Sequence, residues 1–207
     1  MSKKVRYPRV SSFKSAEAFR SHLASIGVQM GCDDEAMKAP ESPLADAYAL
    51  GDFTVGNRFC IQPMEGWDGT EDGQPTDLTR RRWRNFGLSG AKLIWGGEAF
   101  AVVPEGRANP NQLMARPDSQ KAMAELRQIL LDAHGEAMGN TSDMLLGLQL
   151  THSGRFCRPF RKDRMEPAIL YHHPILDGKF GLDSDFPLME DSYICLLYTS
   201  DAADDET

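Results

Sequence analysis

The sequence predicts an α/β fold with a parallel sheet, and three observations lead to this prediction. Three apolar runs have the composition of buried strands, at residues 58–62, 91–97 and 144–150. A helical pattern stands between each run and the next, and turn-forming residues bound the runs. The resulting order, strand–helix–strand–helix–strand, is typical of right-handed parallel βαβ units.

Residues 1–42 are predicted to form an appendage that precedes this fold. Ser15 is a suitable N-cap for a short helix over residues 16–26, in which Leu23 and Ile26 share one side. The acidic, proline-containing stretch that follows predicts a loop rather than another element.

The remaining sequence begins with a predicted hairpin and a first βα unit. Turn signals at Gly51 and Gly56 flank a short β-prone piece, which indicates a hairpin that leads into the first parallel strand. Pro63 ends that strand. Thr76 is a suitable N-cap for a helix over residues 77–88.

The second and third units follow in the same way. The second strand ends before Glu98, and a long loop rich in proline and asparagine connects it to a helix. That helix is predicted to begin at Asp118 or Ser119 and to reach about Met138. A proline- and charge-rich loop follows the third strand, and residues 186–191 predict the approach to another helix.

The third strand carries one polar side chain within an apolar run. The leucines from Leu145 to Leu150 predict a strand that is buried on both faces. Gln149 in such a run is costly unless a partner bonds both its carbonyl and its amide group. The sequence therefore predicts that Gln149 faces a group that hydrogen-bonds it.

Composition and charge exclude several classes of protein. The 207-residue chain is 41% hydrophobic and 26% charged, as expected for a soluble globular protein with a packed core. Its net charge of -7 argues against a nucleic-acid or anionic-membrane partner, and its one basic run, Arg80 to Arg84, is expected to be a solvated helix face. It has no apolar run of about 18 residues, no secretory signal and no CxxC pair, so we expect a cytoplasmic protein.

Polar and small residues stand at the carboxyl ends of the three strands, where parallel α/β folds collect their chemistry. The sequence contains neither a GxGxxG that follows a strand nor a GxxxxGK[ST], so neither of these nucleotide-binding loops is indicated. Amide and backbone groups without an obvious set of metal ligands suit a polar heterocycle. The candidates are Gln62, Pro63, Met64, Ala99 and Gln149.

Three segments resemble successive motifs of the Old Yellow Enzyme family. They read NRFCIQPM at residues 57–64, LIWGGEA at 93–99 followed by PEGR at 104–107, and QLTHSGR at 149–155. Their order and spacing match the family, and the resemblance covers roughly residues 42–193.

The resemblance implies a TIM (β/α)8 barrel that carries FMN. This chain would hold an incomplete barrel, about the first three β/α units and the N-terminal hairpin. The implied activity is that of an ene-reductase, an oxidoreductase that passes a hydride from NAD(P)H through the flavin to an activated, α,β-unsaturated alkene.

The resemblance also implies roles for the candidate residues. Gln62, Pro63 and Met64 would line the flavin through backbone contacts. Ala99 would pack near the ring, and the amide of Gln149 would bond the pyrimidine edge, which carries both carbonyl acceptors and an N–H donor.

Two positions depart from the commoner family pattern. Glu65 stands where many relatives carry a small residue or a cysteine beside the flavin, and a carboxylate there would make flavin reduction harder. Trp67 stands where several relatives carry a tyrosine that faces the substrate. Trp67 is therefore a candidate substrate contact, with a hydrophobic lid residue as the alternative.

Other polar residues near these segments have structural explanations. Glu98 is expected to be a buried acceptor for loop N–H groups, Arg155 to tie loops together by an ion pair, and His152 to make a structural hydrogen bond. The adjacent residues His172 and His173 should point apart in an extended segment, and no third ligand stands at a suitable spacing. We therefore expect no metal site.

The resemblance sets the expected domain organisation. Residues 43–195 are expected to form part of the FMN-binding barrel, and residues 196–207, where the family pattern stops, a non-native or truncated tail. The family's substrate-polarising and proton-donating residues lie on later strands, so the catalytic residues are expected beyond this chain and the fragment alone is expected to be inactive. The alternative is a catalytically inactive fragment, or a barrel of different chemistry that binds no flavin. The expected partner is a small-molecule substrate, and an oligomer is left open.

Overall fold

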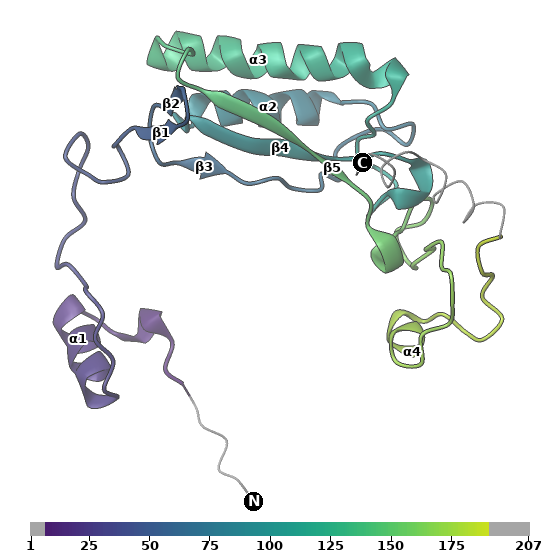
Figure 1. The fold of residues 1–207 in the computed structure, drawn as a ribbon, viewed down its shortest axis with the longest axis horizontal. Coiled ribbons are helices and arrows are strands. Elements are labelled where there is room, and N and C mark those ends of the chain that lie inside the picture. Colours follow the sequence, from purple (N-terminus) through teal and green to yellow (C-terminus); the bar gives the residue numbers. More distant parts are fainter. Residues whose placement is uncertain (1–6, 191–207) are drawn as a thin grey trace, which may run out of the picture. The chain divides into compact units, whose positions relative to one another are not determined.

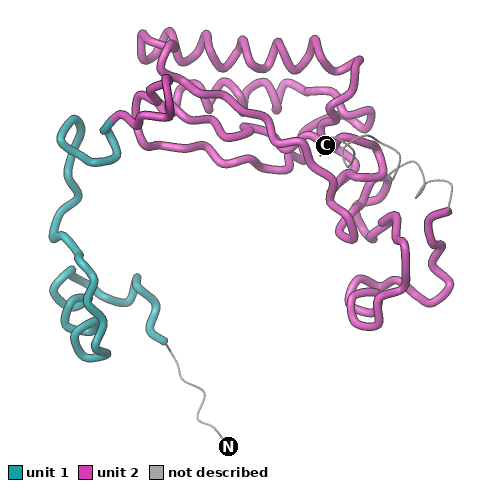
Figure 2. Tube along the Cα trace, in the orientation of Figure 1, with its two compact units in different colours: residues 1–46 teal, residues 47–207 magenta. Residues whose placement is uncertain are grey.

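A computed structural model describes residues 7–190 of the chain. The chain divides into two compact units, Met1–Asp46 and Ala47–Thr207 (Figure 2). The sequence placed this boundary four residues earlier, after residue 42. The predicted tail at residues 196–207 lies outside the described part of the chain.

Over residues 7–46 the first unit contains one α-helix, α1 (Ala16–Ser25), preceded by a 3-10 turn at Val10–Ser12. The side chain of Ser15 accepts a hydrogen bond from the Ala18 N–H, as expected for an N-cap. Leu23 is the buried residue of the helix. Arg20 bonds the Cys32 carbonyl and the Asp34 carboxylate, each at 2.8 Å, and so ties the following loop to α1.

The second unit opens with the predicted hairpin. Strands β1 (Tyr48–Leu50) and β2 (Phe53–Val55) pair antiparallel, and Gly51 takes a positive φ of 57° in the turn between them. Gly56, the second predicted turn residue, donates its N–H to the Asp143 carbonyl at 3.0 Å. This bond ties the end of the hairpin to the segment before β5.

A three-stranded parallel sheet forms the centre of the second unit. Its strands are β3 (Cys60–Ile61), β4 (Leu93–Ala101) and β5 (Leu145–Thr151), in the order β3-β4-β5 (Figure 1). The parallel α/β arrangement predicted from the sequence is confirmed. Over residues 7–190 the sheet is open rather than closed into a barrel, so the incomplete (β/α)8 barrel stays a prediction.

Two helices cover one face of this sheet, α2 (Asp77–Leu88) and α3 (Gln120–Met138) (Figure 1). Thr76 caps α2 as predicted, because its hydroxyl accepts from the Thr79 N–H and the Thr79 hydroxyl accepts from the Thr76 N–H. At Gly87 a β-carbon would lie 2.3 Å from the Leu130 carbonyl, so glycine allows α2 and α3 to approach closely. The core between helices and sheet includes Trp83, Ile94, Phe100, Leu113, Leu126 and Leu130.

The third strand is less buried than its sequence predicts. Leu148 is 46% exposed, Leu150 is 62% exposed, and Gln149 between them is exposed as well. The prediction of a strand buried on both faces is therefore wrong for the described residues. Within them β5 is an edge strand with a neighbour on one side only, and the leucine run by itself does not reveal that position.

The segment after β5 is mostly irregular. Between residues 152 and 190 it contains a 3-10 turn at Gly154–Phe156 and one short helix, α4 (Leu176–Phe180). Residues 186–190, where the sequence predicts the approach to a helix, have no helical structure. Two further 3-10 turns, Pro104–Gly106 and Pro117–Ser119, lie in the loop between β4 and α3. None of the helices in the described residues is long and apolar enough to cross a membrane.

Candidate functional site

The carboxyl ends of the three parallel strands bring together three of the predicted site residues. The N–H of Ala99 donates to the carbonyl of Met64 at 3.1 Å, which joins the loop after β3 to β4. In the β4–β5 pairing Ala99 stands opposite Gln149. Ala99, which is 1% exposed, is therefore the point where the three segments meet.

A bulge in β4 produces this alignment. The register between β4 and β5 shifts between Trp95 and Ala99, and Gly96 takes a positive φ of 71° there. A β-carbon on Gly96 would lie 2.7 Å from the backbone nitrogen of Gln149, so only glycine fits at this close approach. The sequence predicted that β4 ends at residue 97, but the bulge allows the strand to continue to residue 101.

The loop after β3 presents exposed side chains at this end of the sheet. Gln62 is exposed, and its amide donates to the sulfur of Cys60 at 3.2 Å. Met64 is 65% exposed, and Pro63 is half-buried. Trp67, the candidate substrate contact, is 51% exposed.

Gln149 has a side-chain amide that makes no hydrogen bond to any residue between 7 and 190. It lines a cavity of about 350 Å³, together with Trp95, Gly96, Gly147, Leu148 and Leu150. An amide offers one acceptor and two donor hydrogens, which fits the alternating acceptors and donor on the pyrimidine edge of a flavin. The residues at these strand ends therefore suit the ring of FMN.

Glu98, the residue before Ala99, is fully buried and has two partners. Its Oε1 accepts the N–H of Gly66 at 2.9 Å, and its Oε2 accepts Nη2 of Arg82 at 2.5 Å. The prediction that Glu98 is a buried acceptor for a loop N–H is confirmed. Arg82 in turn bonds both carboxylate oxygens of Asp68, at 2.9 and 2.7 Å.

The two carboxylates that share Arg82 have pKa values shifted in opposite directions. Burial raises the pKa of Glu98, although the charge and hydrogen bond of Arg82 oppose the rise. Burial also acts to raise the pKa of Asp68, but there the hydrogen bond and charge of Arg82 prevail and the pKa lies below its ordinary value. Asp68 is thus the carboxylate that the network stabilises most clearly in its charged form.

The loop after β4 supports the same region with buried polar side chains. Asn109 is fully buried and donates from Nδ2 to the Gly66 carbonyl at 3.0 Å. Gln112, also fully buried, donates from Nε2 to the Ala99 carbonyl at 2.8 Å. Arg107 donates to the carbonyls of four residues, Thr70, Glu71, Pro110 and Gln112.

The turn after β5 contains the remaining candidates. Nδ1 of His152 accepts the N–H of Gly154 at 3.0 Å, so the prediction of a structural hydrogen bond is confirmed. Ser153 bonds Glu65 at 3.3 Å, which links this turn to the loop after β3. Arg155 forms an ion pair with Asp177 at 2.5 Å, as the sequence predicted for a residue that ties loops together.

The paired histidines belong to the same cluster. Nδ1 of His172 lies 2.9 Å from Oδ2 of Asp177, and the backbone N–H of His173 donates to the same oxygen at 2.9 Å. Nδ1 of His173 instead accepts N–H groups of the following turn. Over residues 7–190 no group of three or more His, Cys, Asp or Glu side chains is arranged to hold a metal ion.

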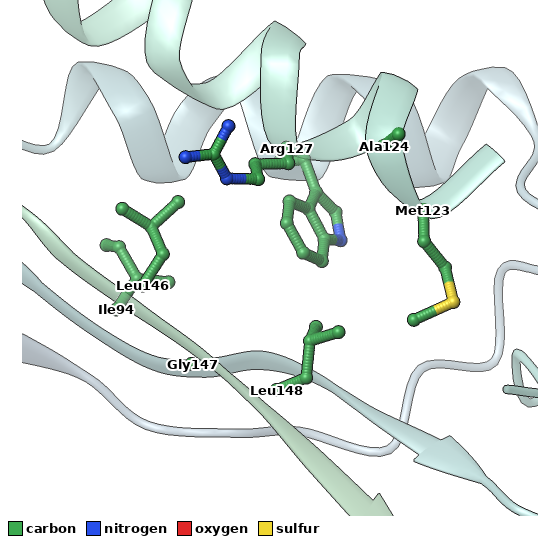
Figure 3. A pocket seen from close by; sticks show the side chains of 8 residues that line it. Ile94, Met123, Ala124, Arg127, Leu146, Gly147 and Leu148 are labelled. Atoms are coloured by element: carbon green, nitrogen blue, oxygen red, sulfur yellow. The ribbon is translucent and has the colours of Figure 1, made fainter. Parts of the chain in front are cut away.

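Another cavity, of about 230 Å³, lies on the helix-covered face of the sheet. Side chains of α2 and α3 line one side of it and side chains of β4 and β5 the other (Figure 3). The lining is mostly apolar and contains none of the predicted site residues, so we interpret this cavity as a packing gap between the helices and the sheet. The lining residues are Trp83, Ile94, Met123, Ala124, Arg127, Leu146, Gly147 and Leu148.

The sequence missed the partners of Glu98. It assigned Arg82 to a solvated basic run, but Arg82 is only 24% exposed and connects Glu98 to Asp68. Arg82 stands four residues after Leu78 and four before Phe86, so it lies on the same side of the helix as these two apolar residues. This spacing was the sequence pattern that distinguished it from the other arginines of the run. Asp68 and Asn109 lie in loops, where no periodic pattern in the sequence indicates which side chains are buried.

Comparison with known proteins gives matches among solved structures. No protein-family model and no curated protein matches the sequence. An Old Yellow Enzyme homologue from Zymomonas mobilis matches 54% of this chain at 28% identity, with a TM-score of 0.43, over 28% of its own chain. The Old Yellow Enzyme from Trypanosoma cruzi matches 56% of this chain at 28% identity, with a TM-score of 0.42, also over 28% of its chain.

Morphinone reductase matches 61% of this chain at 22% identity, with a TM-score of 0.43, over 31% of its own chain. This chain therefore spans less than a third of the length of these three proteins. The Zymomonas and Trypanosoma proteins bear the name of the family that the three sequence motifs resemble.

Proposed function

We propose that this chain is the flavin-contacting part of an FMN-dependent oxidoreductase of the Old Yellow Enzyme kind, which uses NAD(P)H to reduce an activated, α,β-unsaturated alkene. The observation that carries the proposal is the meeting of three strand ends at Ala99. There the carbonyl of Met64 bonds the Ala99 N–H, and Gln149 stands opposite on β5. The motif resemblance supports the proposal, because it names these three residues among those that would contact the flavin.

Each of these residues has a definite task toward the ring. The amide of Gln149 would bond the pyrimidine edge, because it offers a donor and an acceptor that no residue between 7 and 190 uses. The backbone of Gln62, Pro63 and Met64 would lie along the ring. The methyl side chain of Ala99 leaves room for a flat group to approach.

FMN, when bound, supplies the hydride transfer from nicotinamide to alkene, and the protein positions the ring and tunes its potential. Glu65 is exposed on the loop that would contact the ring, and a carboxylate beside a reduced flavin disfavours the added negative charge. Trp67 would contact the substrate. We propose a cytoplasmic location and a small-molecule substrate for the protein.

Titration of the purified chain with FMN tests the proposal. We expect the visible absorption of FMN to shift and its fluorescence to be quenched as the ring leaves water for the strand ends. Riboflavin is a useful second probe, because it has the same ring without the phosphate and should produce the same spectral change. Free-flavin spectra at saturating protein would contradict the proposal and favour the alternative of a chain that binds no flavin.

A further inference from the structure

Buried polar side chains hold the backbone of the loop after β3 in place. The backbone of Gly66 is bonded on both sides: its N–H by Glu98 and its carbonyl by Asn109. Both of these side chains are fully buried. The carbonyl of Met64 is bonded by Ala99. The exposed side chains of the loop thus stand on a backbone that is fixed from inside.

The approach of this loop to Glu98 leaves no spare room. A β-carbon on Gly66 would lie 2.6 Å from Nη2 of Arg82 and 2.9 Å from both Oε1 of Glu98 and Oδ1 of Asp68. Only a residue without a side chain lets the backbone N–H reach the buried carboxylate here. The contact therefore requires a glycine at position 66 as well as the carboxylate of Glu98.

The charges of the network explain why a carboxylate can be buried at this point. Glu98 is paired with Arg82, which is also held by Asp68, and Arg82 donates to the Gly97 carbonyl at 3.4 Å. A buried carboxylate is tolerated when it is paired and its oxygens are hydrogen-bonded, as both oxygens of Glu98 are. The network joins three segments: β4, which carries Glu98, α2, which carries Arg82, and the loop after β3, which carries Gly66 and Asp68.

We propose that Glu98 is the positioning residue of the flavin-contacting loop: it fixes residues 63–68, through the N–H of Gly66 and the guanidinium of Arg82, in the conformation that receives the ring. This inference rests on the proposed function. Glu98 itself is fully buried behind the loop and acts through Gly66 rather than on the ring.

The variant Glu98→Gln tests the inference with little change in volume. Its amide oxygen can still accept the Gly66 N–H, but its NH2 group faces Nη2 of Arg82, so that two donors oppose each other. The matched control is Glu125→Gln, which removes an exposed carboxylate on α3 that accepts a hydrogen bond from Arg80 of α2 at 3.0 Å. Circular dichroism establishes that each variant is folded.

Two measurements are made on the wild-type chain and on each variant. Hydrogen exchange at the backbone amides of residues 64–68, above all at the Gly66 N–H that bonds Glu98, reports the loop directly and needs no flavin. FMN titration, with the absorption spectrum of the bound ring, reports the site. For Glu98→Gln we expect at least about tenfold faster loop exchange and about tenfold weaker FMN binding, with a shifted flavin band, and a tenfold change in affinity equals about 1.4 kcal/mol. Glu125→Gln should match the wild type in both measurements.

The outcomes separate this inference from the proposed function. Wild-type FMN affinity and an unchanged flavin spectrum in Glu98→Gln overturn the inference while the proposed function stands. If the wild type binds no FMN, the proposed function fails, and loop exchange alone decides whether Glu98 positions the loop. Should Glu98→Gln not fold, Gly66→Ala carries the same test, because its methyl group displaces the loop while all three charged side chains remain.

Discussion

Strands β4 and β5 are neighbours with similar apolar sequences but very different surroundings. From Gly96 to Ala101 every residue of β4 is buried, whereas Leu148, Gln149 and Leu150 of β5 are exposed. The cause is position: β4 lies between two strands, and β5 has one neighbour in the described sheet. Loop residues Gln112 and Leu113 also bond the carboxyl-terminal end of β4. Hydrophobic composition predicts a strand, but the segments that cover its faces determine its burial.

The same contrast separates the polar residues of the two strands. Glu98 on β4 is fully buried and has both oxygens bonded, so it serves the structure around it. Gln149 on β5 is exposed, and its amide has no partner between residues 7 and 190. We infer that Glu98 holds the site from behind and that Gln149 is available to a ligand.

The largest difference between the strands should come from truncating their apolar side chains. Phe100→Ala on β4 removes a ring that is 1% exposed in the core, and we expect the free energy of unfolding to fall by about 3–5 kcal/mol. Leu150→Ala on β5 removes a side chain that is 62% exposed, and we expect a change within about 0.5 kcal/mol. Urea denaturation of both variants measures the difference. Equal losses would show that β5 is covered in solution.

A second large effect should follow from removing the buried carboxylate. Glu98→Ala leaves the Gly66 N–H without its acceptor and Arg82 with Asp68 as its remaining carboxylate partner. We expect a loss of about 3 kcal/mol in the free energy of unfolding, as for the breaking of a buried ion pair. A loss below about 1 kcal/mol, the range of exposed pairs, would mean that the network contributes little to the fold.

Asp68 should make stability depend on pH. Its pKa in the folded protein lies below the ordinary value of 3.8, because the hydrogen bond and charge of Arg82 outweigh the effect of burial. The stabilisation is therefore complete above the ordinary pKa and is lost as the pH falls through the folded value. The pKa of Glu98 is raised in the folded protein, so its contribution to the free energy of unfolding falls as the pH rises from the ordinary pKa to the folded pKa.

The variant Asp68→Asn isolates this contribution. We expect the free energy of unfolding, measured by urea denaturation from pH 6 to pH 2, to fall less steeply with acidification in the variant than in the wild type. Asp118→Asn is the control, because its carboxylate is 64% exposed and pairs with Arg116 away from Glu98. Parallel pH curves for wild type and Asp68→Asn would show that Asp68 is not held in its charged form by Arg82.

Much of the fold could be predicted because local signals agreed with the final structure. The Thr76 cap, the bounds of α2 and the order of strands and helices follow from short patterns in the sequence. The extension of β4 to residue 101 was not predicted, because the glycine pair at residues 96 and 97 was read as the end of the strand. Gly96 has a positive φ and lies in a bulge of β4. The bulge is defined by the pairing of β4 with β5, which the sequence of β4 alone does not contain.

The candidate site was predictable in part. The sequence placed Gln62, Ala99 and Gln149 at strand ends, but it could not show that Ala99 stands opposite Gln149, because register depends on the bulge. It also treated Arg82 as one charge in a basic run. A charge run contains no information about which member is buried against a carboxylate from another strand, and this tertiary contact became visible only in the folded chain.

We propose that the side-chain amide of Gln149, which has no hydrogen-bond partner between residues 7 and 190, binds the flavin ring, and FMN titration of Gln149→Leu is the test. The variant should keep its free energy of unfolding within about 0.5 kcal/mol, since the side chain is exposed. Its affinity for FMN should fall about tenfold, the cost of roughly one lost hydrogen-bonding group, or about 1.4 kcal/mol. Gln128→Leu, which removes a glutamine bonded to Asp132 on α3, should bind FMN as the wild type does. Equal FMN affinity in Gln149→Leu and the wild type would show that the Gln149 amide does not bind the ring.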